Sequence, residues 1–209
     1  MPQQDWLVQD NGECLSFRSP RQWDLLTPTT PYRLHRFLTE LDDVVNEAEI
    51  TQQEETEYLP ILRRLMRKLL LNVYWISKSV PSSSSETGTG FQLLYDELGF
   101  PFTLQTEIML PGSTTIIHNH GTWGVVATLQ GQQKNAFWKP LPIAEYPQNI
   151  EKVGEQVFQN GDIISFTTGA IHSVEAIGNE PTVTLNLYGD TNASKRFKYD
   201  PETHSAYHF

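Results

Sequence analysis

Three histidines lie in two glycine-framed segments whose spacing could create a metal site. His118 and His120 are separated by one residue, so on a β-strand both imidazoles leave the same face. The third histidine, His172, follows Gly161 in a later segment of related pattern. Two imidazoles from one strand and one from another element can converge on a metal ion and leave positions free for substrate and dioxygen. The pattern predicts a mononuclear site with three histidine ligands.

Iron(II) is the metal we favour for these ligands, because it can bind substrate and dioxygen together and move electrons between them. Zinc would bind the imidazoles well but has no redox chemistry. Histidines on strands can also be buried hydrogen-bonding groups without a metal, which is the alternative interpretation. The remaining histidines, His35, His204 and His208, lie in helix or tail contexts and are expected at the surface.

Composition limits the classes of function. The 209 residues, 38% hydrophobic and 19% charged, suit one globular domain with a sizeable core. The net charge of -10 argues against a nucleic-acid binder. The apolar stretch around Leu69–Ile76 is too short to span a membrane. Cys14 is the single cysteine, so no intrachain disulfide can form, and without a signal-peptide pattern the expected compartment is the cytoplasm.

The first half of the chain is expected to hold an irregular arm followed by two helices. The first thirty residues contain several prolines and little periodicity. Helical periodicity begins at Pro31 and continues to Ala48, and a second helix is predicted from about Glu54 to Ser77. A basic arc lies opposite the apolar face of the second helix and is interpreted as solvated, with docking of an anionic partner as the alternative. The arc consists of Arg63, Arg64, Arg67 and Lys68.

After a flexible Ser/Gly-rich connector at Pro81–Gly90, the pattern changes to short strands separated by turn residues. The predicted strands are Phe102–Leu110, Thr114–His120, Trp123–Gln130, Lys134–Trp138, Lys152–Phe158, Asp162–Phe166, Ile171–Ile177 and Thr182–Tyr188. The prediction is a mainly β protein, a double-stranded β-helix (cupin or jelly roll) with an N-terminal helical segment. Residues 1–90 would hold the arm, helices and connector, and residues 91–209 the barrel and a C-terminal tail.

Both glycine-framed segments resemble the two cupin motifs. In the first, the ligands His118 and His120 lie between Gly112 and Gly131 at the family's spacing, and Gly124 stands where most cupins have a glutamate ligand. Three neutral imidazoles leave a divalent metal with its full double charge, which favours an anionic substrate. Gly124 is also expected to clear volume beside the metal.

In the second segment, Gly161, Gly169 and His172 match the motif. Thr167 replaces the usual proline, and Ala176 replaces the usual asparagine.

Within the cupins, the chain resembles the cysteine dioxygenase-type thiol dioxygenases, closest to the bacterial 3-mercaptopropionate dioxygenase-like subgroup. The resemblance covers roughly Phe91 to Tyr199 and includes the string from His118 to Val126, His-Asn-His-Gly-Thr-Trp-Gly-Val-Val. It implies an enzyme with one Fe(II) held by His118, His120 and His172, which uses both atoms of dioxygen to oxidise a small thiol to its sulfinate.

The resemblance also suggests substrate-binding residues. Counting back from the first ligand places Gln92 where the mercaptopropionate enzymes have a glutamine and the cysteine dioxygenases an arginine. Trp123 is expected to wall the pocket, with core packing as the alternative. Gly124 occupies the region of the cysteine that cross-links to a tyrosine in many animal enzymes, so no cross-link is expected.

A late strand carries the remaining candidate catalytic residues. The family has a Ser-x-His-x-Tyr triad there, whereas this chain has Thr184, Asn186 and Tyr188. Spacing of two directs all three side chains to one face. Asparagine can hydrogen-bond but cannot relay a proton by titration, so the resemblance leaves open what replaces the histidine. Glu107 and Glu175 are interpreted as surface residues.

Two other functions remain open at this stage. One is another three-histidine cupin dioxygenase that cleaves a β-diketone or a flavonol. The other is a non-catalytic metal-binding cupin, which the loss of the triad histidine at Asn186 makes plausible. The identity of the thiol and the oligomeric state do not follow from the sequence.

Overall fold

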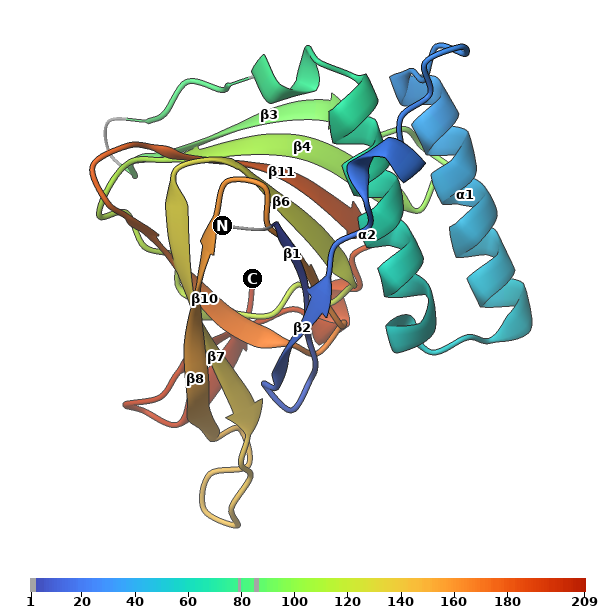
Figure 1. Ribbon diagram of the computed structural model, residues 1–209. Coiled ribbons are helices and arrows are strands. Elements are labelled where there is room, and N and C mark those ends of the chain that lie inside the picture. The colour runs from blue at the N-terminus through green and yellow to red at the C-terminus, as the bar shows by residue number, and fades with distance from the viewer. Residues whose placement is uncertain (1–2, 79, 85–86) are drawn as a thin grey trace.

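The computed structural model describes residues 3–78, 80–84 and 87–209 of the chain. Two β-sheets enclose an interior, and two helices cover one outer side (Figure 1). The helices are α1 (Leu34–Thr51) and α2 (Glu55–Asn72), with short turns η1 (Gln22–Asp24), η2 (Ile76–Lys78) and η3 (Ala193–Lys195). The strands are β1 (Gln4–Val8), β2 (Cys14–Arg18), β3 (Thr89–Tyr95), β4 (Phe102–Met109), β5 (Ile117–His118), β6 (Gly124–Gln130), β7 (Gln132–Pro140), β8 (Ile150–Gln159), β9 (Ile163–Phe166), β10 (Ile171–Ile177), β11 (Thr182–Gly189), β12 (Phe197–Asp200) and β13 (Ser205–His208).

The eight strands from β4 to β11 pair in a nested antiparallel order. The first strand of this series, β4, pairs with the last, β11. Moving inward along the chain, β5 pairs with β10, β6 with β9 and β7 with β8. The chain is therefore one long antiparallel ribbon, folded at the β7–β8 hairpin and wound into two facing sheets. This order is that of a double-stranded β-helix, so the predicted fold class is confirmed.

The arm that was expected to be irregular contains two strands. β1 pairs in parallel with β9, and β2 pairs with β1, which extends the first sheet to seven strands. In β1, Leu7 and Val8 are buried, a two-residue signal too short to stand out among prolines. β3, also not predicted, begins within the Pro81–Gly90 connector and pairs with β4. Residues 85 and 86 of that connector lie outside the described residues.

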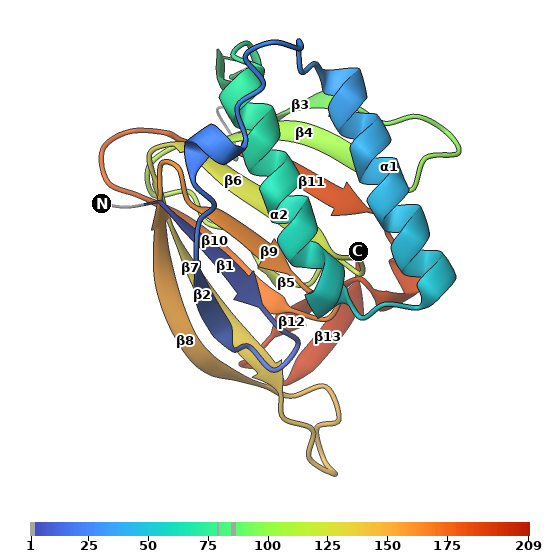
Figure 2. The ribbon, with the colours of Figure 1, turned by 45° about the vertical axis from the view of Figure 1, so that its right-hand side comes forward.

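The two predicted helices are present with shifted ends. Helix α1 begins at Leu34 rather than Pro31, because the chain is still extended at Arg33. A capping box formed by Glu54 and Glu57 starts α2, which ends at Asn72. Figure 2 shows α2 lying across the seven-stranded sheet, where it contacts β6 and β9, with α1 packed alongside α2. Within the described residues, no helix combines the length and apolar character needed to cross a membrane.

The interpretation of the basic arc as solvated is wrong for Arg63 and Arg67, which are only 2% and 4% exposed. Arg67 donates hydrogen bonds to the Asp5 carboxylate of β1 and to the carbonyl of Gly161. Arg63 donates to the hydroxyl of Ser165 on β9. The long apolar stems of arginine allow a charged group to cross the core and reach a partner. Arg63 and Arg67 thus hold α2 against β1 and β9.

Strand β11 separates the helix-covered core from the interior of the barrel. Its side chains alternate, and Leu185 and Leu187 are buried in the same core as α1 and α2. Thr184, Asn186 and Tyr188, hereafter the β11 row, face the space between the two sheets. The spacing of two residues in the sequence therefore predicted correctly that these three side chains share one face of the strand.

Candidate metal centre

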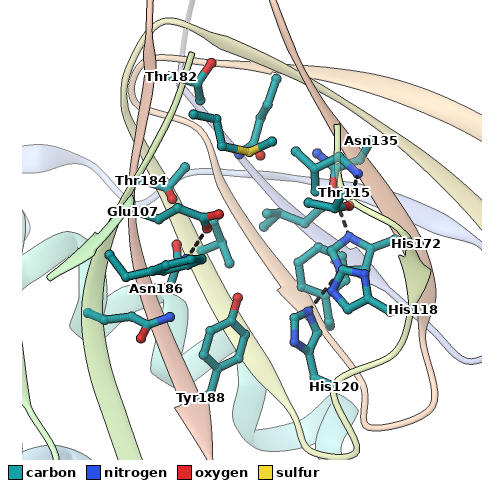
Figure 3. A pocket seen from close by; sticks show the side chains of 18 of the residues that line it. Glu107, Thr115, His118, His120, Asn135, His172, Thr182, Thr184, Asn186 and Tyr188 are labelled. Carbon is teal, nitrogen blue, oxygen red and sulfur yellow. Dashed lines mark hydrogen bonds between the residues drawn. The ribbon is translucent and has the colours of Figure 1, made fainter. Parts of the chain in front are cut away.

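The three histidines meet at one end of the barrel interior. His118 lies on β5 directly opposite His172 of β10, and His120 lies in the turn after β5. Ring centroids are 4.8 to 5.1 Å apart, and one nitrogen from each ring can be chosen so that all three lie within 4.8 Å of one another. Figure 3 shows the rings converging, and this group is hereafter the histidine cluster.

Hydrogen bonds on the far side of two rings orient their ligand nitrogens. His118 Nδ1 donates to the carbonyl of Ile116 at 2.9 Å, and His172 Nδ1 donates to Asn135 Oδ1 at 3.0 Å. Because each Nδ1 carries its proton, each Nε2 has a free lone pair. Metal-binding histidines are commonly held in this way by a second partner. Two of the three rings are therefore in the tautomer that binds a metal through Nε2.

The charge state and spacing of the cluster also fit a metal ion. Burial lowers the pKa of His118 and, much further, those of His120 and His172, so all three rings are neutral near pH 7. The Nε2 atoms of His120 and His172 are 2.9 Å apart. Two nitrogens bound at right angles with bonds of about 2.1 Å would be separated by about 3.0 Å. The donor set could thus hold one divalent ion.

The cluster opens into a cavity of about 180 Å³ between the sheets, hereafter the main cavity. All three residues of the β11 row line it opposite the cluster (Figure 3). The other lining residues are Phe91, Gln105, Glu107, Met109, Thr115, Val126, Gln133, Asn135, Ile164, Phe166, Val174, Thr182 and Arg196. The structure therefore brings together the predicted ligands and the predicted catalytic row.

The volume expected to be free at Gly124 is occupied by Tyr188. The two residues are cross-strand partners, and a Cβ atom at position 124 would lie 2.9 Å from two carbons of the Tyr188 ring. The same ring stacks on His120, with centroids 4.6 Å apart. Tyr188 thus fills the space between Gly124 and His120 that was expected to be clear.

The two predicted substrate-binding residues do not line the main cavity. Gln92 is exposed on β3, and its neighbour Phe91 lines the cavity instead. Gln105 on β4, which pairs with Asn186, is a glutamine that does line it. Trp123 is 7% exposed and packs edge-on against Tyr58 of α2 on the helix side of the sheet. For Trp123 the core-packing alternative holds.

Of the two glutamates expected at the surface, Glu175 is half-buried and forms an ion pair with Lys134, whereas Glu107 lines the main cavity. Glu107 accepts a hydrogen bond of 2.9 Å from Asn186 Nδ2. Burial raises the pKa of Glu107 to about 7, although the Asn186 hydrogen bond acts in the opposite direction. The surface interpretation of Glu107 is therefore wrong, and its place in an alternating strand opposite Thr184 was the only available signal.

Arg196, on which the sequence placed no role, lines the same cavity. It follows η3 in the segment after the barrel, and its guanidinium lies 4.3 Å from the ring centroid of Phe209. Its positive charge contributes to the lowered pKa values of His118 and His120. Its Nε is buried without a hydrogen-bond partner among the described residues. A small anion in the cavity could use this charge.

Asn135 offers a test of the metal site through its contact with His172. If the cluster holds a divalent metal ion, we expect Asn135→Ala to weaken its binding about 10- to 100-fold, because loss of an outer hydrogen-bond partner frees the ring and its tautomer. The measurement is titration of the metal-free protein with iron(II) under anaerobic conditions. Asn149→Ala is the matched control, since Asn149 accepts a similar hydrogen bond from His204 away from the cavity. Equal affinity of wild type and Asn135→Ala would contradict this role.

No protein-family profile and no curated protein matches the chain. Solved structures with a similar arrangement include an oxalate oxidase in complex with glycolate, with 15% identity and a TM-score of 0.42 over 55% of this chain and 57% of that one. The Lactobacillus farciminis oxalate decarboxylase formate complex has 16% identity and a TM-score of 0.42 over 54% and 31%. The cupin domain of Schizosaccharomyces pombe Cnp3 has 14% identity and a TM-score of 0.39 over 49% and 64%. The chain therefore spans less than two thirds of each of these proteins.

At such low identities the similarities concern the fold alone, and the fold assignment rests on the strand order. That order and the histidine cluster define a cupin-type double-stranded β-helix with a three-histidine group that could hold a metal ion.

Proposed function

We propose that this protein is a mononuclear iron(II) dioxygenase that oxidises a small thiol carboxylate to its sulfinate. The observation that carries the proposal is that the histidine cluster and Arg196 line one small cavity. Three neutral ligands favour an anionic donor such as a thiolate on the metal. An arginine in the same cavity favours a carboxylate at the other end of the same molecule.

The groups that line the main cavity have distinct roles in this reaction. Bound iron(II) would supply the redox-active centre that takes substrate and dioxygen together. Arg196 binds the substrate carboxylate and so fixes the direction in which the thiol points. The Tyr188 hydroxyl, which burial keeps protonated by raising its pKa, can donate a hydrogen bond to the reacting groups. The proposed compartment is the cytoplasm, where small thiols remain reduced.

The test of the function is oxygen consumption by the iron(II)-loaded protein with 3-mercaptopropionate, cysteine and cysteamine. We expect about one dioxygen consumed per thiol, with the sulfinate as product, for at least one thiol carboxylate. Uptake with an enolizable β-diketone and none with any thiol would select the diketone alternative. Stoichiometric iron with no uptake on either class would select the non-catalytic alternative.

Arg196→Gln is expected to separate carboxylate recognition from the chemical step. Hydrogen bonds to charged groups contribute roughly 1.5–3 kcal/mol, so KM for 3-mercaptopropionate should rise about 10- to 100-fold. KM for cysteamine, which has no carboxylate, should not rise. Steady-state oxygen uptake measures both, with Arg64→Gln on the exposed side of α2 as the control. An equal rise for both thiols would contradict the proposed carboxylate contact.

A further inference from the structure

Glu107 is a carboxyl group inside the main cavity that the proposed function has not yet used. It lies on β4 opposite Thr184 and accepts a hydrogen bond from Asn186 Nδ2. Figure 3 shows its carboxyl group on the wall facing the histidine cluster, with the Tyr188 hydroxyl between the two sides. A substrate bound to the histidine cluster would therefore occupy the same cavity as the Glu107 carboxyl group.

No cationic side chain neutralises Glu107 among the described residues, in which it forms no ion pair. The groups that face it are few. β3 contributes Phe91, its cross-strand partner, and β11 contributes the amide of Asn186 and the phenol of Tyr188. The neutral histidine cluster lines the opposite wall, and Arg196 is the one cation lining this cavity. Glu107 is therefore free to gain or lose a proton.

We propose that Glu107 is the proton acceptor of the main cavity, which takes up the proton that a thiol loses when it binds as a thiolate. The inference rests on the proposed thiol substrate. In this step the S–H bond breaks, the electron pair stays on sulfur, and an O–H bond forms on the Glu107 carboxylate. The charge inside the cavity does not change, so the transfer needs no exchange with bulk solvent.

The chemistry of the two groups suits such a transfer. An acceptor with a pKa of about 7 lies close to the range of a free thiol, whose pKa is about 8.5. The double charge of a metal held by the cluster lowers the thiol pKa further. The negative thiolate raises the pKa of the nearby carboxyl and so holds the transferred proton.

Asn186 is suited to position Glu107 in both protonation states. As the structure shows, its Nδ2 donates to the carboxylate, while its Oδ1 is buried without a partner among the described residues. An amide turned the other way can accept from the protonated acid. A histidine at position 186 would compete for the proton, whereas asparagine leaves it on Glu107. With asparagine at position 186, the group that exchanges a proton is therefore Glu107 on the neighbouring strand β4.

The experiment counts the protons released when 3-mercaptopropionate binds to the iron(II) protein without oxygen, by calorimetry in buffers of different ionisation enthalpy. At about pH 8, ionised Glu107 should take the thiol proton, and wild type should release close to none. At about pH 5.5, Glu107 is already protonated, and wild type should release about one proton per thiol. Glu107→Gln should release about one at both values, and Glu175→Gln should behave as wild type.

The outcomes separate this inference from the proposed function. Binding with the same proton count in wild type and Glu107→Gln would overturn the role of Glu107 and leave the thiol proposal intact. Failure of any thiol to bind would overturn both. If Glu107→Gln does not fold, the number of protons that wild type releases at pH 5.5 and at pH 8 is sufficient for the test. Release of one proton at both pH values would exclude an acceptor that titrates near pH 7. A purely structural role for Glu107 would not alter a proton count.

Discussion

Replacing His172 with alanine is expected to abolish both iron retention and thiol-dependent oxygen uptake while the barrel stays folded. His172 is the most buried member of the histidine cluster, at 4% exposure, and its Nε2 lies 2.9 Å from that of His120. Loss of an outer partner alone costs about 10- to 100-fold in metal affinity, so loss of a ligand should cost more than about 100-fold. Iron content after dialysis and initial rates of oxygen uptake measure the two effects.

The matched control is His204→Ala, which removes a histidine that hydrogen-bonds Asn149 outside the main cavity. That variant should retain iron and activity. His118→Ala should reproduce the loss, which guards against a folding defect specific to position 172. Stoichiometric iron in the folded His172→Ala protein would contradict the three-histidine site, and full activity without iron would exclude the metal reaction.

Local patterns in the sequence were sufficient to predict the strands of the barrel and the grouping of the three histidines. Short strands separated by turn residues identify β4 to β11. The strand β5 ends at His118, so alternation along a strand did not by itself place His120, which lies just after β5 and still joins the cluster. The β11 row follows from the same alternation. These features depend on the period of the strands and on the order of the segments, so they can be predicted without knowledge of tertiary contacts.

Features that depend on tertiary contacts could not be predicted from periodicity. Gln92 was placed by counting back across a turn, and a shift of one residue on a strand moves a side chain to the other face. Arg63 and Arg67 look like a solvated arc until the partner strand β1, distant in sequence, is placed beside them. Arg196 enters the cavity from a segment outside the barrel motifs.

The close contact between Gly124 and Tyr188 can be tested by substitution. Gly124→Ala should destabilise the protein by about 1–3 kcal/mol, because the new Cβ would lie 2.9 Å from the Tyr188 ring and overpack the site. Denaturant unfolding measures the loss. Gly154→Ala is the control, since a Cβ there meets nothing within 4 Å and should change stability by less than about 0.5 kcal/mol.

The cause is identified by combining the substitution with Tyr188→Ala. If the tyrosine ring is the obstacle, Gly124→Ala should cost almost nothing in the Tyr188→Ala background, which gives a coupling of about 1–3 kcal/mol. An unchanged cost in that background would place the strain elsewhere on β6.

The Tyr188→Ala background also leaves space for a carboxylate beside the histidine cluster. In that background, Gly124→Glu should bind iron(II) more tightly and the thiol more weakly, because a negative ligand partly neutralises the metal. Tighter binding of the metal with weaker binding of the thiol would show that the pair of Gly124 and Tyr188 keeps the site cationic, as the proposed anionic substrate requires.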